Sequence, residues 1–367
     1  MCLEWRRGCR YRPLVGQSGK TLRAVPRNTD WVGEVMQVDA VFMLAAVAVS
    51  QSQQEPLAGL VLKDVPVPEV KPGWSLVRVL SSSLNMHDVF TLRGIGHPAD
   101  QLPMILGCDA AGLDEDGNEV LIYPVIANPD AGRGDETLDP ARALLSEQHN
   151  GTFAEYVTVP RRNLIPKPGW LSFDEAACLP VAWATAYRML FTHARITAGD
   201  RCLVQGAGGG VASAAINLAA AAGAVVYATS RSEDKRKAAL KWGAKAAFAT
   251  GERLPERVDV VIETVGDATW SHSMKSLRPG GTIVIAGATS GMNPPADLGR
   301  VFYLQQRIVG STGSTRSELV AMLRMMESTG VRPIIDRPMG LEKIHDGFRL
   351  MMNGDITGKV VIHPPMP

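Results

Sequence analysis

Short apolar runs, separated by turn residues, fill the first part of the chain from Met43 onward. Two of them are WSLVRVL and NEVLIYPVI, and Lys71-Pro72-Gly73 is a typical turn between such runs. Short runs bounded by glycine, proline and asparagine are characteristic of β-strands. The pattern predicts an antiparallel, partly barrel-shaped β-rich unit over residues 43–168, with a polar loop at residues 127–150.

The pattern changes after Pro168. Residues 173–191 have helical spacing, with Asp174 and Glu175 in a suitable first turn. Beyond them, runs that are apolar throughout, such as VDVVIETVG and TIVIAGA, alternate with helical segments. Strands that are buried on both faces and separated by helices indicate a parallel sheet. We therefore predict an α/β protein with a doubly wound domain over residues 169–315. Residues 316–367 should return to the first unit through the final strand GKVVIHP.

Composition narrows the possible partners. The chain has 367 residues, 46% hydrophobic and 20% charged, with a formal net charge of +1. This balance argues against nucleic acid or an anionic membrane as partner, and the longest apolar run, residues 40–49, is shorter than the ~20 residues of a membrane span. Residues 1–42 carry seven Lys and Arg against four Asp and Glu, and we expect a loosely ordered extension there. Five scattered cysteines without a C-x-x-C pair favour a cytoplasmic protein.

One segment combines a strand, a glycine-rich turn and a helix: VQGAGGGVASAAINLA. Glycines in such a turn let the backbone approach a pyrophosphate, and the helix that follows offers free N–H groups and a positive dipole end. The strict G-x-G-x-x-G spacing is not met, and a purely structural turn is the alternative. The strand–turn–helix context favours dinucleotide binding. The predicted contacts are Gly206, Gly208, Gly209, Gly210 and Val211.

The next strand ends in Thr229-Ser230-Arg231, with Lys235 one turn into the following helix. NAD-selective enzymes usually place an acidic residue here to hold the ribose 2′-hydroxyl. A hydroxyl and two cations instead suit a 2′-phosphate, which a carboxylate would repel. The alternative is a solvated basic helix start, which Glu233 and Asp234 would suit. Ser230, Arg231 and Lys235 therefore predict NADP(H) as the cofactor.

Together these features resemble the medium-chain dehydrogenase/reductase superfamily, in particular its zinc-free, quinone oxidoreductase-like branch. The resemblance covers nearly all of residues 43–364 and implies a GroES-like catalytic domain joined to a Rossmann domain. Its landmarks, in the family's order, are SLNMHDVFTLRG, LPMILGCDAAG, GTFAEYVTVP, AACLPVAWATAYRML, VQGAGGGV, LRPGGTIVIAG and GKVVI.

The resemblance also bears on metal binding. In zinc-dependent members the catalytic ligands fall at positions that match Asn85, Cys108 and Val181 here. A catalytic zinc needs three N, S or O protein ligands plus an open position, which asparagine and valine do not supply. We therefore predict no metal. A remodelled site built from His87, Cys108 and Asp109 is the alternative.

Further site residues follow from the resemblance alone. It implies that Asn85 and Thr185 lie near the nicotinamide, that Lys359 is close to the cofactor cleft, and that two backbone segments flank the nicotinamide and its ribose: Val265-Gly266 and Ala286-Gly287. Each has a structural alternative as a turn, helix or surface residue. Some relatives carry a tyrosine proton donor where this chain has Phe90. His87 is the nearest alternative donor, and water is another.

The sequence thus predicts an NADPH-dependent reductase of a quinone or an α,β-unsaturated carbonyl compound, without a catalytic metal. Two alternatives remain: an alcohol or aldehyde dehydrogenase with a remodelled zinc site, and a non-catalytic NADPH-binding protein. We expect a small, apolar carbonyl substrate and a homodimer formed through the sheet edge at RIVGST. Expected cleft walls are Met86, Phe90, Met104 and Phe302, and the expected partners of an anionic group are Arg93 and Arg300.

Overall fold

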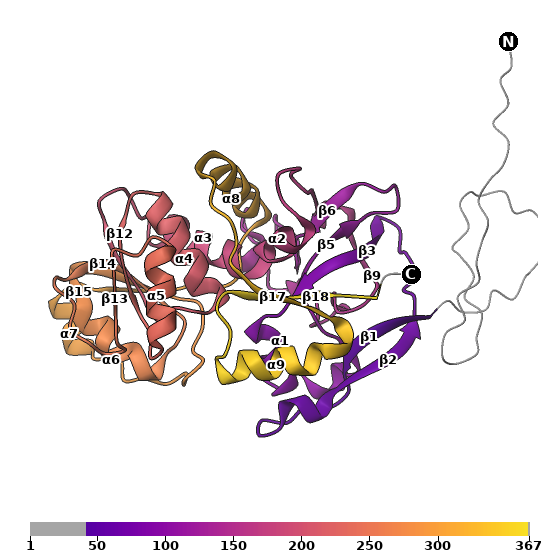
Figure 1. The fold of residues 1–367 in the computed structure, drawn as a ribbon, viewed down its shortest axis with the longest axis horizontal. Helices are drawn as coiled ribbons and strands as arrows, with labels where there is room; N and C mark the ends of the chain where they lie inside the picture. The colour runs from indigo at the N-terminus through magenta and orange to yellow at the C-terminus, as the bar shows by residue number, and fades with distance from the viewer. Residues whose placement is uncertain (1–41, 366–367) are drawn as a thin grey trace, which may run out of the picture.

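A computed structural model describes residues 42–365 of the chain. It shows two lobes joined side by side, with the β-rich N-terminal lobe in indigo and purple and the second lobe in pink and orange (Figure 1). The predicted extension, residues 1–42, lies outside the described residues except for Phe42, which begins the first strand. No helix in the described part of the chain is long and apolar enough to cross a membrane.

The N-terminal lobe is built from two main sheets, and its strands are predominantly antiparallel. A three-stranded sheet has the order β2-β1-β4, and a larger sheet has the order β10-β6-β5-β3-β18-β17, with β9 also paired to β3. Within the predicted loop at residues 127–150, strand β8 pairs with β7, which lies directly before the loop. The strand bounds are β1 Phe42–Ala48, β2 Leu60–Pro66, β3 Trp74–Ser83, β4 Met104–Ile105, β5 Asp109–Leu113, β6 Glu119–Ile122, β7 Val125–Ile126, β8 Ala143–Leu144, β9 Tyr156–Pro160, β10 Leu164–Pro166, β17 Ile335–Gly340 and β18 Lys359–His363.

The second lobe is a parallel sheet flanked by helices. Its strand order is β13-β12-β11-β14-β15-β16, and every neighbouring pair is parallel. The order reverses between β11 and β14, which is where doubly wound sheets bind their ligands. The elements are β11 Arg201–Val204, α4 Gly210–Ala221, β12 Val225–Thr229, α5 Glu233–Lys241, β13 Ala246–Phe248, β14 Val258–Glu263, α6 Asp267–Ser276, β15 Leu277–Ile285, α7 Leu298–Tyr303 and β16 Arg307–Gly310. The predicted GroES-like and Rossmann architecture is confirmed.

The chain crosses back to the first lobe after the Rossmann sheet. Helix α8 (Arg316–Thr329) comes first, and its residues Leu319 and Met322 pack in the same apolar cluster as Trp183. Strand β18 then pairs with β3, and α9 (Ile344–Asn353) lies against α1 (Met86–Leu92). The final strand therefore rejoins the first lobe as expected. We propose that the boundary of the Rossmann domain lies between residues 315 and 316.

The segment 173–191 is not the single α-helix that its spacing predicts. Regular α-helix is limited to α2 (Phe173–Ala177) and α3 (Ala184–Tyr187), and wider π-helical turns occupy residues 179–183 and 188–193. Pro180 has no N–H to donate, and the N–H of Val181 donates instead to Asp109 Oδ1 at 2.8 Å. The helix is therefore interrupted where it meets the first lobe.

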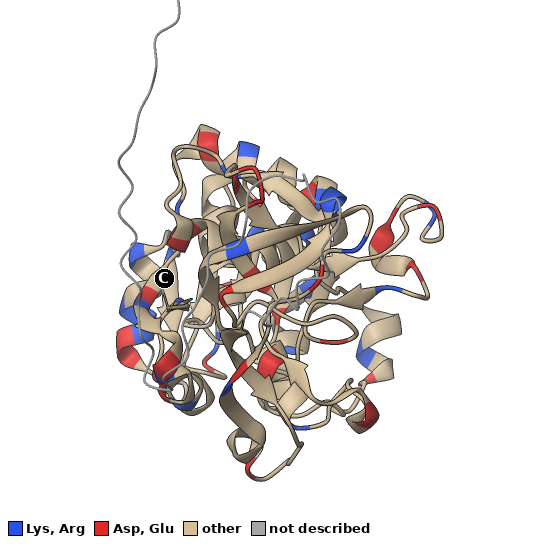
Figure 2. Cartoon of the chain, turned by 90° about the vertical axis from the view of Figure 1, so that its right-hand side faces the viewer, with Lys and Arg blue, Asp and Glu red and all other residues tan. Residues whose placement is uncertain are grey.

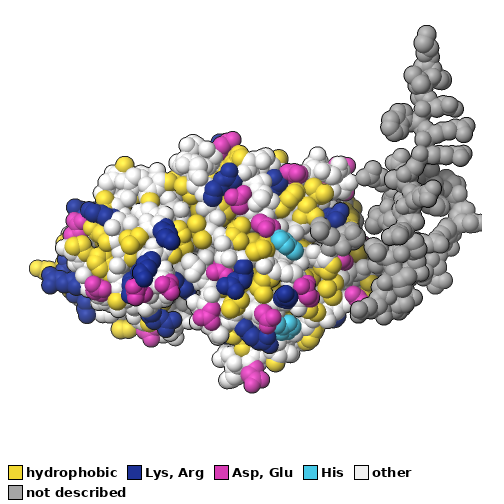
Figure 3. Space-filling model, viewed as in Figure 1, with side chains coloured by type: hydrophobic (Ala, Val, Ile, Leu, Met, Phe, Trp, Pro, Cys, Tyr) yellow, Lys and Arg dark blue, Asp and Glu magenta, His cyan; other side chains and the backbone are white. Residues whose placement is uncertain are grey.

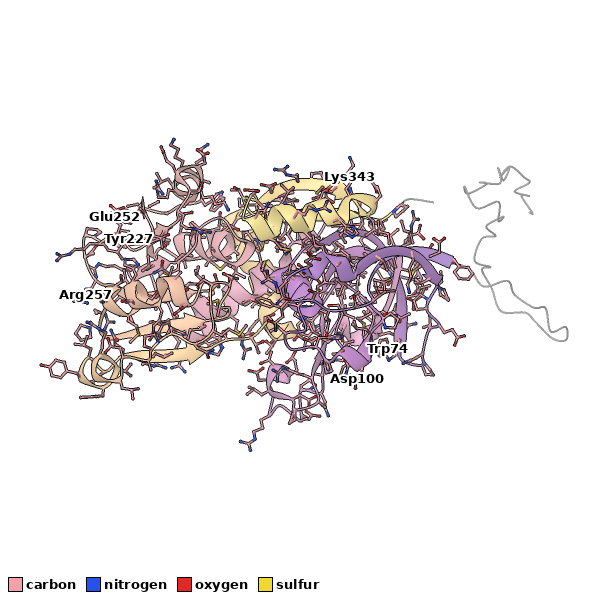
Figure 4. All side chains as sticks on the ribbon, turned by 90° about the horizontal axis from the view of Figure 1, so that it is seen from below. Trp74, Asp100, Tyr227, Glu252, Arg257 and Lys343 are labelled. Carbon is pink, nitrogen blue, oxygen red and sulfur yellow. The ribbon has the colours of Figure 1, made fainter. Side chains whose placement is uncertain are left out.

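Charged side chains of both signs are interspersed over the outer helices and loops (Figure 2), and the face in Figure 3 shows no extended patch of a single sign. Figure 4 shows Tyr227, Glu252 and Arg257 at the Rossmann end of the molecule, and Trp74 and Asp100 at the other end. The Tyr227 hydroxyl donates to Glu256 at 2.6 Å. On the faces shown, this mixture of charges among the described residues agrees with the near-neutral net charge.

Candidate active site

A single large cleft, with a volume of about 1440 Å³, is lined by residues from both lobes. It runs from the glycine-rich turn of the Rossmann lobe to helix α1 of the other lobe. The predicted site residues that line it are Asn85, His87, Thr185, Gly206, Gly208, Gly209, Gly210, Val211, Ser230, Arg231, Lys235, Val265, Ala286, Gly287 and Lys359. Gly266 is the exception and does not contribute to the wall.

The glycine-rich turn has the backbone that a dinucleotide site requires. Gly206 and Gly208 have positive φ angles of 71° and 125°, which side-chain-bearing residues rarely adopt. A Cβ on Gly206 would lie 2.6 Å from Val265 Cγ2, and a Cβ on Gly210 would lie 2.8 Å from Lys359 Cδ. Helix α4 begins at Gly210 with Gly209 as its N-cap, and no side chain caps it. Its first N–H groups are therefore free for an anion.

The end of β12 forms the other wall of this part of the cleft. Ser230 is buried, whereas Arg231 is exposed. Lys235 Nζ donates to the carbonyl of Gly354 at 2.5 Å, which brings it back over the glycine-rich turn. Arg236, which the sequence analysis did not single out, donates to the carbonyls of Ser230 at 2.8 Å and Arg231 at 3.3 Å. It fixes the backbone that presents the two predicted ribose-site side chains.

Glu263 holds the turn after β14 from behind. Its carboxylate is fully buried and accepts bonds from the N–H groups of Val265 at 2.8 Å and Gly266 at 3.1 Å. The hydroxyls of Thr269 and Ser273 also donate to it. Gly266 therefore faces the supporting carboxylate, and the predicted cleft contact is left to Val265. The role of Gly266, with φ 89°, is the tight turn.

At the other end of the cleft, Asp109 joins four separate segments. It is completely buried, and its Oδ2 lies 2.8 Å from Asn85 Nδ2, 2.8 Å from the Ser83 hydroxyl and 3.1 Å from Lys359 Nζ. Lys359 is 3% exposed and also donates to the carbonyl of Leu84 at 2.7 Å and to Asn85 Oδ1 at 2.6 Å. An ammonium group has three donors, so all of them are used within the protein.

The Asn85 side chain is fully engaged in this network. Its amide nitrogen donates to Asp109 and its amide oxygen accepts from Lys359, so both ends of the amide are engaged. Thr185, by contrast, lines the cleft with 6% of its surface exposed, and its hydroxyl has no hydrogen bond to any described residue. Of these two predicted catalytic residues, Thr185 is the one with a free polar group.

His87 lies between Cys108 and Glu147 at the cleft wall. Its Nδ1 is 3.3 Å from Cys108 Sγ and its Nε2 is 3.0 Å from Glu147 Oε1. Burial lowers the pKa of His87, but the contacts with Cys108 and the carboxylates of Glu147 and Asp88 outweigh it and raise the pKa well above its ordinary value. Burial also raises the pKa of the Cys108 thiol. We therefore describe His87 and Glu147 as an imidazolium–carboxylate pair.

The donor set does not suit the zinc ion of the wider family. Asp109, one ligand of the alternative remodelled site, is already bonded to Lys359, Asn85 and the Val181 N–H. His87, Asp88 and Cys108 do place three ligand atoms within 4.8 Å of one another. However, both Asp88 oxygens accept backbone N–H groups, and Cys108 Sγ contacts the carbonyl of Leu145 at 3.1 Å. Each group therefore already has a protein partner.

Two of the expected apolar walls are wrong. Met86 and Phe90 line the cleft, but Met104 is buried at the edge strand β4, and Phe302 is 74% exposed on α7, outside the cleft. Arg93 lines the cleft, whereas Arg300 lies on α7 beside Asp297. Glu147 and Arg236 were missed as contributors, and Asp109 was named only as an alternative metal ligand, because a loop carboxylate, a helical arginine and a buried ion pair carry no distinguishing local pattern. The spacing of Asn85 and Asp109 becomes meaningful only when β3 and β5 pair.

The fold and the cleft define a two-domain oxidoreductase of the dinucleotide-dependent type. Residues 71–169 match the Alcohol dehydrogenase GroES-like domain family, and residues 210–328 match the Zinc-binding dehydrogenase family. A 2-methylene-furan-3-one reductase of Solanum lycopersicum is 33% identical over 312 residues, which cover 82% of this chain and 74% of that protein. The chain therefore belongs to the medium-chain dehydrogenase/reductase superfamily.

Solved structures agree with this assignment. A crystal structure of an NAD-dependent alcohol dehydrogenase is similar with a TM-score of 0.81 and 34% identity, covering 88% of this chain and all of the other. A 2-octenoyl-CoA carboxylase reductase, in complex with NADP and 2-octenoyl-CoA, has a TM-score of 0.80 at 26% identity, covering 88% of each chain. The two-lobed fold is thus shared with an alcohol dehydrogenase and with a carboxylase reductase, whose names give different activities.

Proposed function

We propose that this chain is an NADPH-dependent reductase of a carbonyl compound conjugated to a double bond, an enone or a quinone, and that it uses no catalytic metal. One observation carries the proposal: a single cleft joins an uncapped helix N-terminus and a cationic ribose end to a polar end whose zinc-ligand positions hold an amide and an aliphatic side chain. The similarity to a 2-methylene-furan-3-one reductase and to a 2-octenoyl-CoA carboxylase reductase supports the same reaction class.

The residues present fit NADP(H). The free N–H groups at the start of α4 and the positive φ angles of Gly206 and Gly208 suit a pyrophosphate. Ser230, Arg231 and Lys235 suit a 2′-phosphate, and no acidic side chain occupies the end of β12. When bound, NADPH supplies the hydride that adds to the β-carbon of the substrate, while a proton adds to the α-carbon.

The protein's own contribution is orientation, polarity and the proton. Among Asn85, Lys359 and Thr185, the Thr185 hydroxyl is the donor that is free to bind the substrate carbonyl. The polar groups of Asn85 and Lys359 are hydrogen-bonded to Asp109 and to each other. Asn85 is therefore proposed as a positioning residue that holds Lys359. The His87–Glu147 pair keeps a proton at the cleft wall, where Phe90 has none to give. We propose that His87 gives this proton to the α-carbon, directly or through water, and regains a proton from solvent after each turnover.

The test follows NADPH oxidation with an enone or a quinone, with and without a chelator, and compares Arg231→Glu with wild type. We expect turnover that the chelator does not change, and a Kd for NADPH at least tenfold weaker in the variant, because a carboxylate replaces a phosphate partner. The matched control is Arg257→Glu, which lies at the outer end of the Rossmann lobe (Figure 4) and bonds Lys275 and Leu277 carbonyls. No turnover across a broad acceptor panel, or equal NADPH affinity in both variants, contradicts the proposal.

The similarity to an NAD-dependent alcohol dehydrogenase favours a second candidate function, an alcohol or aldehyde dehydrogenase with a remodelled zinc site, in which the metal would have to replace the present partners of His87, Asp88 and Cys108. Metal analysis of purified protein separates the two. About one zinc per chain, with activity lost on Cys108→Ala, supports the second candidate. Substoichiometric metal with full NADPH-dependent activity supports the first.

We also propose a homodimer formed through the outer edge of the Rossmann sheet. Strand β16 is the last strand of that sheet, and Ile308 on it is 40% exposed. Helix α7 next to it in sequence carries three strongly exposed apolar side chains: Leu298, Phe302 and Tyr303. An unpaired edge beside exposed apolar surface is a natural pairing site. Sedimentation analysis of Phe302→Glu should show a shift from dimer to monomer.

A further inference from the structure

The charged side chains that line the cleft do not balance. Its Lys and Arg residues are Arg93, Arg142, Arg231, Lys235 and Lys359, and Glu147 is the acidic residue among the lining positions. Lys359 is paired with Asp109, and Glu147 is paired with His87. The proposed cofactor accounts for Arg231 and Lys235. Arg93 and Arg142 therefore remain without an ion-pair partner among the described residues of the cleft wall, although Arg142 is exposed and the charge of Asp139 lies near it.

The two arginines also lack ion-pair partners among the described residues outside the cleft wall. Neither forms an ion pair with any residue in the range 42–365. The Nε atom of Arg93 is buried and has no hydrogen-bond partner there. A buried donor without a partner is costly, since it has lost its water and gained nothing in return. The terminal Nη atoms of Arg93 form no hydrogen bond to a described residue either, and these are the atoms that an occupant of the cleft can reach.

Helix geometry places Arg93 at a definite position along the cleft. Met86, Phe90 and Arg93 all line it, and their spacing of four and three residues puts them on one face of α1 and its C-cap. At 1.5 Å per residue, Arg93 lies roughly 10 Å along the axis from Met86. The stripe therefore starts beside Asn85, continues with apolar contacts, and ends in a cation. Arg142 immediately precedes β8 and lies in the loop that brings Glu147 to His87.

We propose that the natural substrate carries an anionic group, a carboxylate or a phosphate, held by Arg93 and Arg142 at the far end of the α1 stripe, with an apolar section between this group and the reacting double bond against Met86 and Phe90. This inference rests on the proposed reductase function and deepens it, because it names the part of the substrate that does not react. Binding energy from that part orients the double bond without entering the chemistry.

The experiment compares three α,β-unsaturated carbonyl substrates with NADPH. One carries a carboxylate on an apolar chain of roughly 10 Å, the length of the α1 stripe, one is its methyl ester, and one is a CoA thioester, which carries phosphates. We expect kcat/KM for at least one anionic substrate to exceed that of the ester roughly tenfold to hundredfold, mainly through KM. The better of the two anionic substrates identifies the chemistry of the group. Equal kcat/KM for all three overturns the proposal.

Variants connect the effect to the two arginines. Arg93→Met and Arg142→Met should each lower kcat/KM for the anionic substrate much more than kcat/KM for the ester, and Arg93→Lys should restore part of the preference. Arg300→Met is the matched control, because Arg300 lies outside the cleft beside Asp297. Loss of activity toward both substrates, or the same loss in the control, contradicts the assignment.

A binding measurement separates this inference from the proposed reaction. Calorimetry with the saturated carboxylate, added to protein with NADPH, reports the anion site without any turnover. Binding that is lost in Arg93→Met supports the site even if no acceptor is reduced. Turnover of neutral enones, with no binding of either the saturated carboxylate or the saturated CoA thioester, leaves the reductase proposal intact and rejects the anion site.

Discussion

The two ends of the cleft are built in different ways. The cofactor end uses backbone: a glycine-rich turn, the first N–H groups of α4 and the tip of β12 all come from residues 206–235. The substrate end uses groups from four separate segments, since the side chains of Asn85 and Lys359 and the backbone N–H of Val181 meet around the Asp109 carboxylate. A continuous segment is tolerant of changes elsewhere, whereas a network of distant groups depends on every member.

The largest expected effect comes from removing the carboxylate at the centre of the network. Asp109→Asn leaves the buried Lys359 ammonium without its counter-charge, and breaking such a pair costs about 3–5 kcal/mol of stability. Urea unfolding measures it. The control is Asp346→Asn, because its pair with Arg349 is exposed on both sides and should contribute little.

A companion variant keeps this prediction informative if Asp109→Asn folds poorly. The double variant Asp109→Asn with Lys359→Met removes both charges and should recover part of the lost stability, because no unpaired charge stays buried. A single variant as stable as wild type would show that the network is not what joins these segments.

The next largest effect belongs to the cofactor end. Gly206→Ala places a Cβ 2.6 Å from Val265 Cγ2 at a φ of 71°, which should cost about 1–2 kcal/mol in the left-handed conformation. The displaced turn should also weaken the Kd for NADPH at least tenfold. Titration by fluorescence measures it, with Gly169→Ala as the control, where a Cβ meets nothing within 4 Å. Similar affinities for the two variants would mean that the turn does not carry the pyrophosphate.

The smallest effect tests the proton at the substrate end. The pKa of folded His87 is raised, so its charge contributes stability fully below its unfolded pKa of ~6.5, and this contribution is lost as the pH rises through the higher folded pKa. Turnover limited by the His87 proton should fall over the same range. We expect kcat of wild type to decline at alkaline pH and kcat of His87→Gln to be lower but flat. A decline of the same shape in both would assign the proton to water or another group.

Local sequence patterns account for the cofactor end and the general architecture. The alternation of apolar runs and helices predicted the parallel sheet, and the strand–turn–helix segment predicted Gly206, Gly208 and Gly210 at the cleft, because these features depend on neighbours within about thirty residues. The same reasoning predicted the helical segment at residues 173–191, but it did not show that parts of the segment would be π-helical or that the Val181 N–H would donate to Asp109.

Only the folded chain reveals the substrate end. Nothing near Asp109 in the sequence indicates that Lys359, 250 residues away, will form an ion pair with it. Nothing near Glu147 indicates that this residue of a polar loop will contact His87. Pairing of β18 with β3 and of β3 with β5 brings these groups together. Backbone conformation depends mainly on adjacent residues, whereas the partner of a buried charge depends on which strand packs beside it in the folded chain.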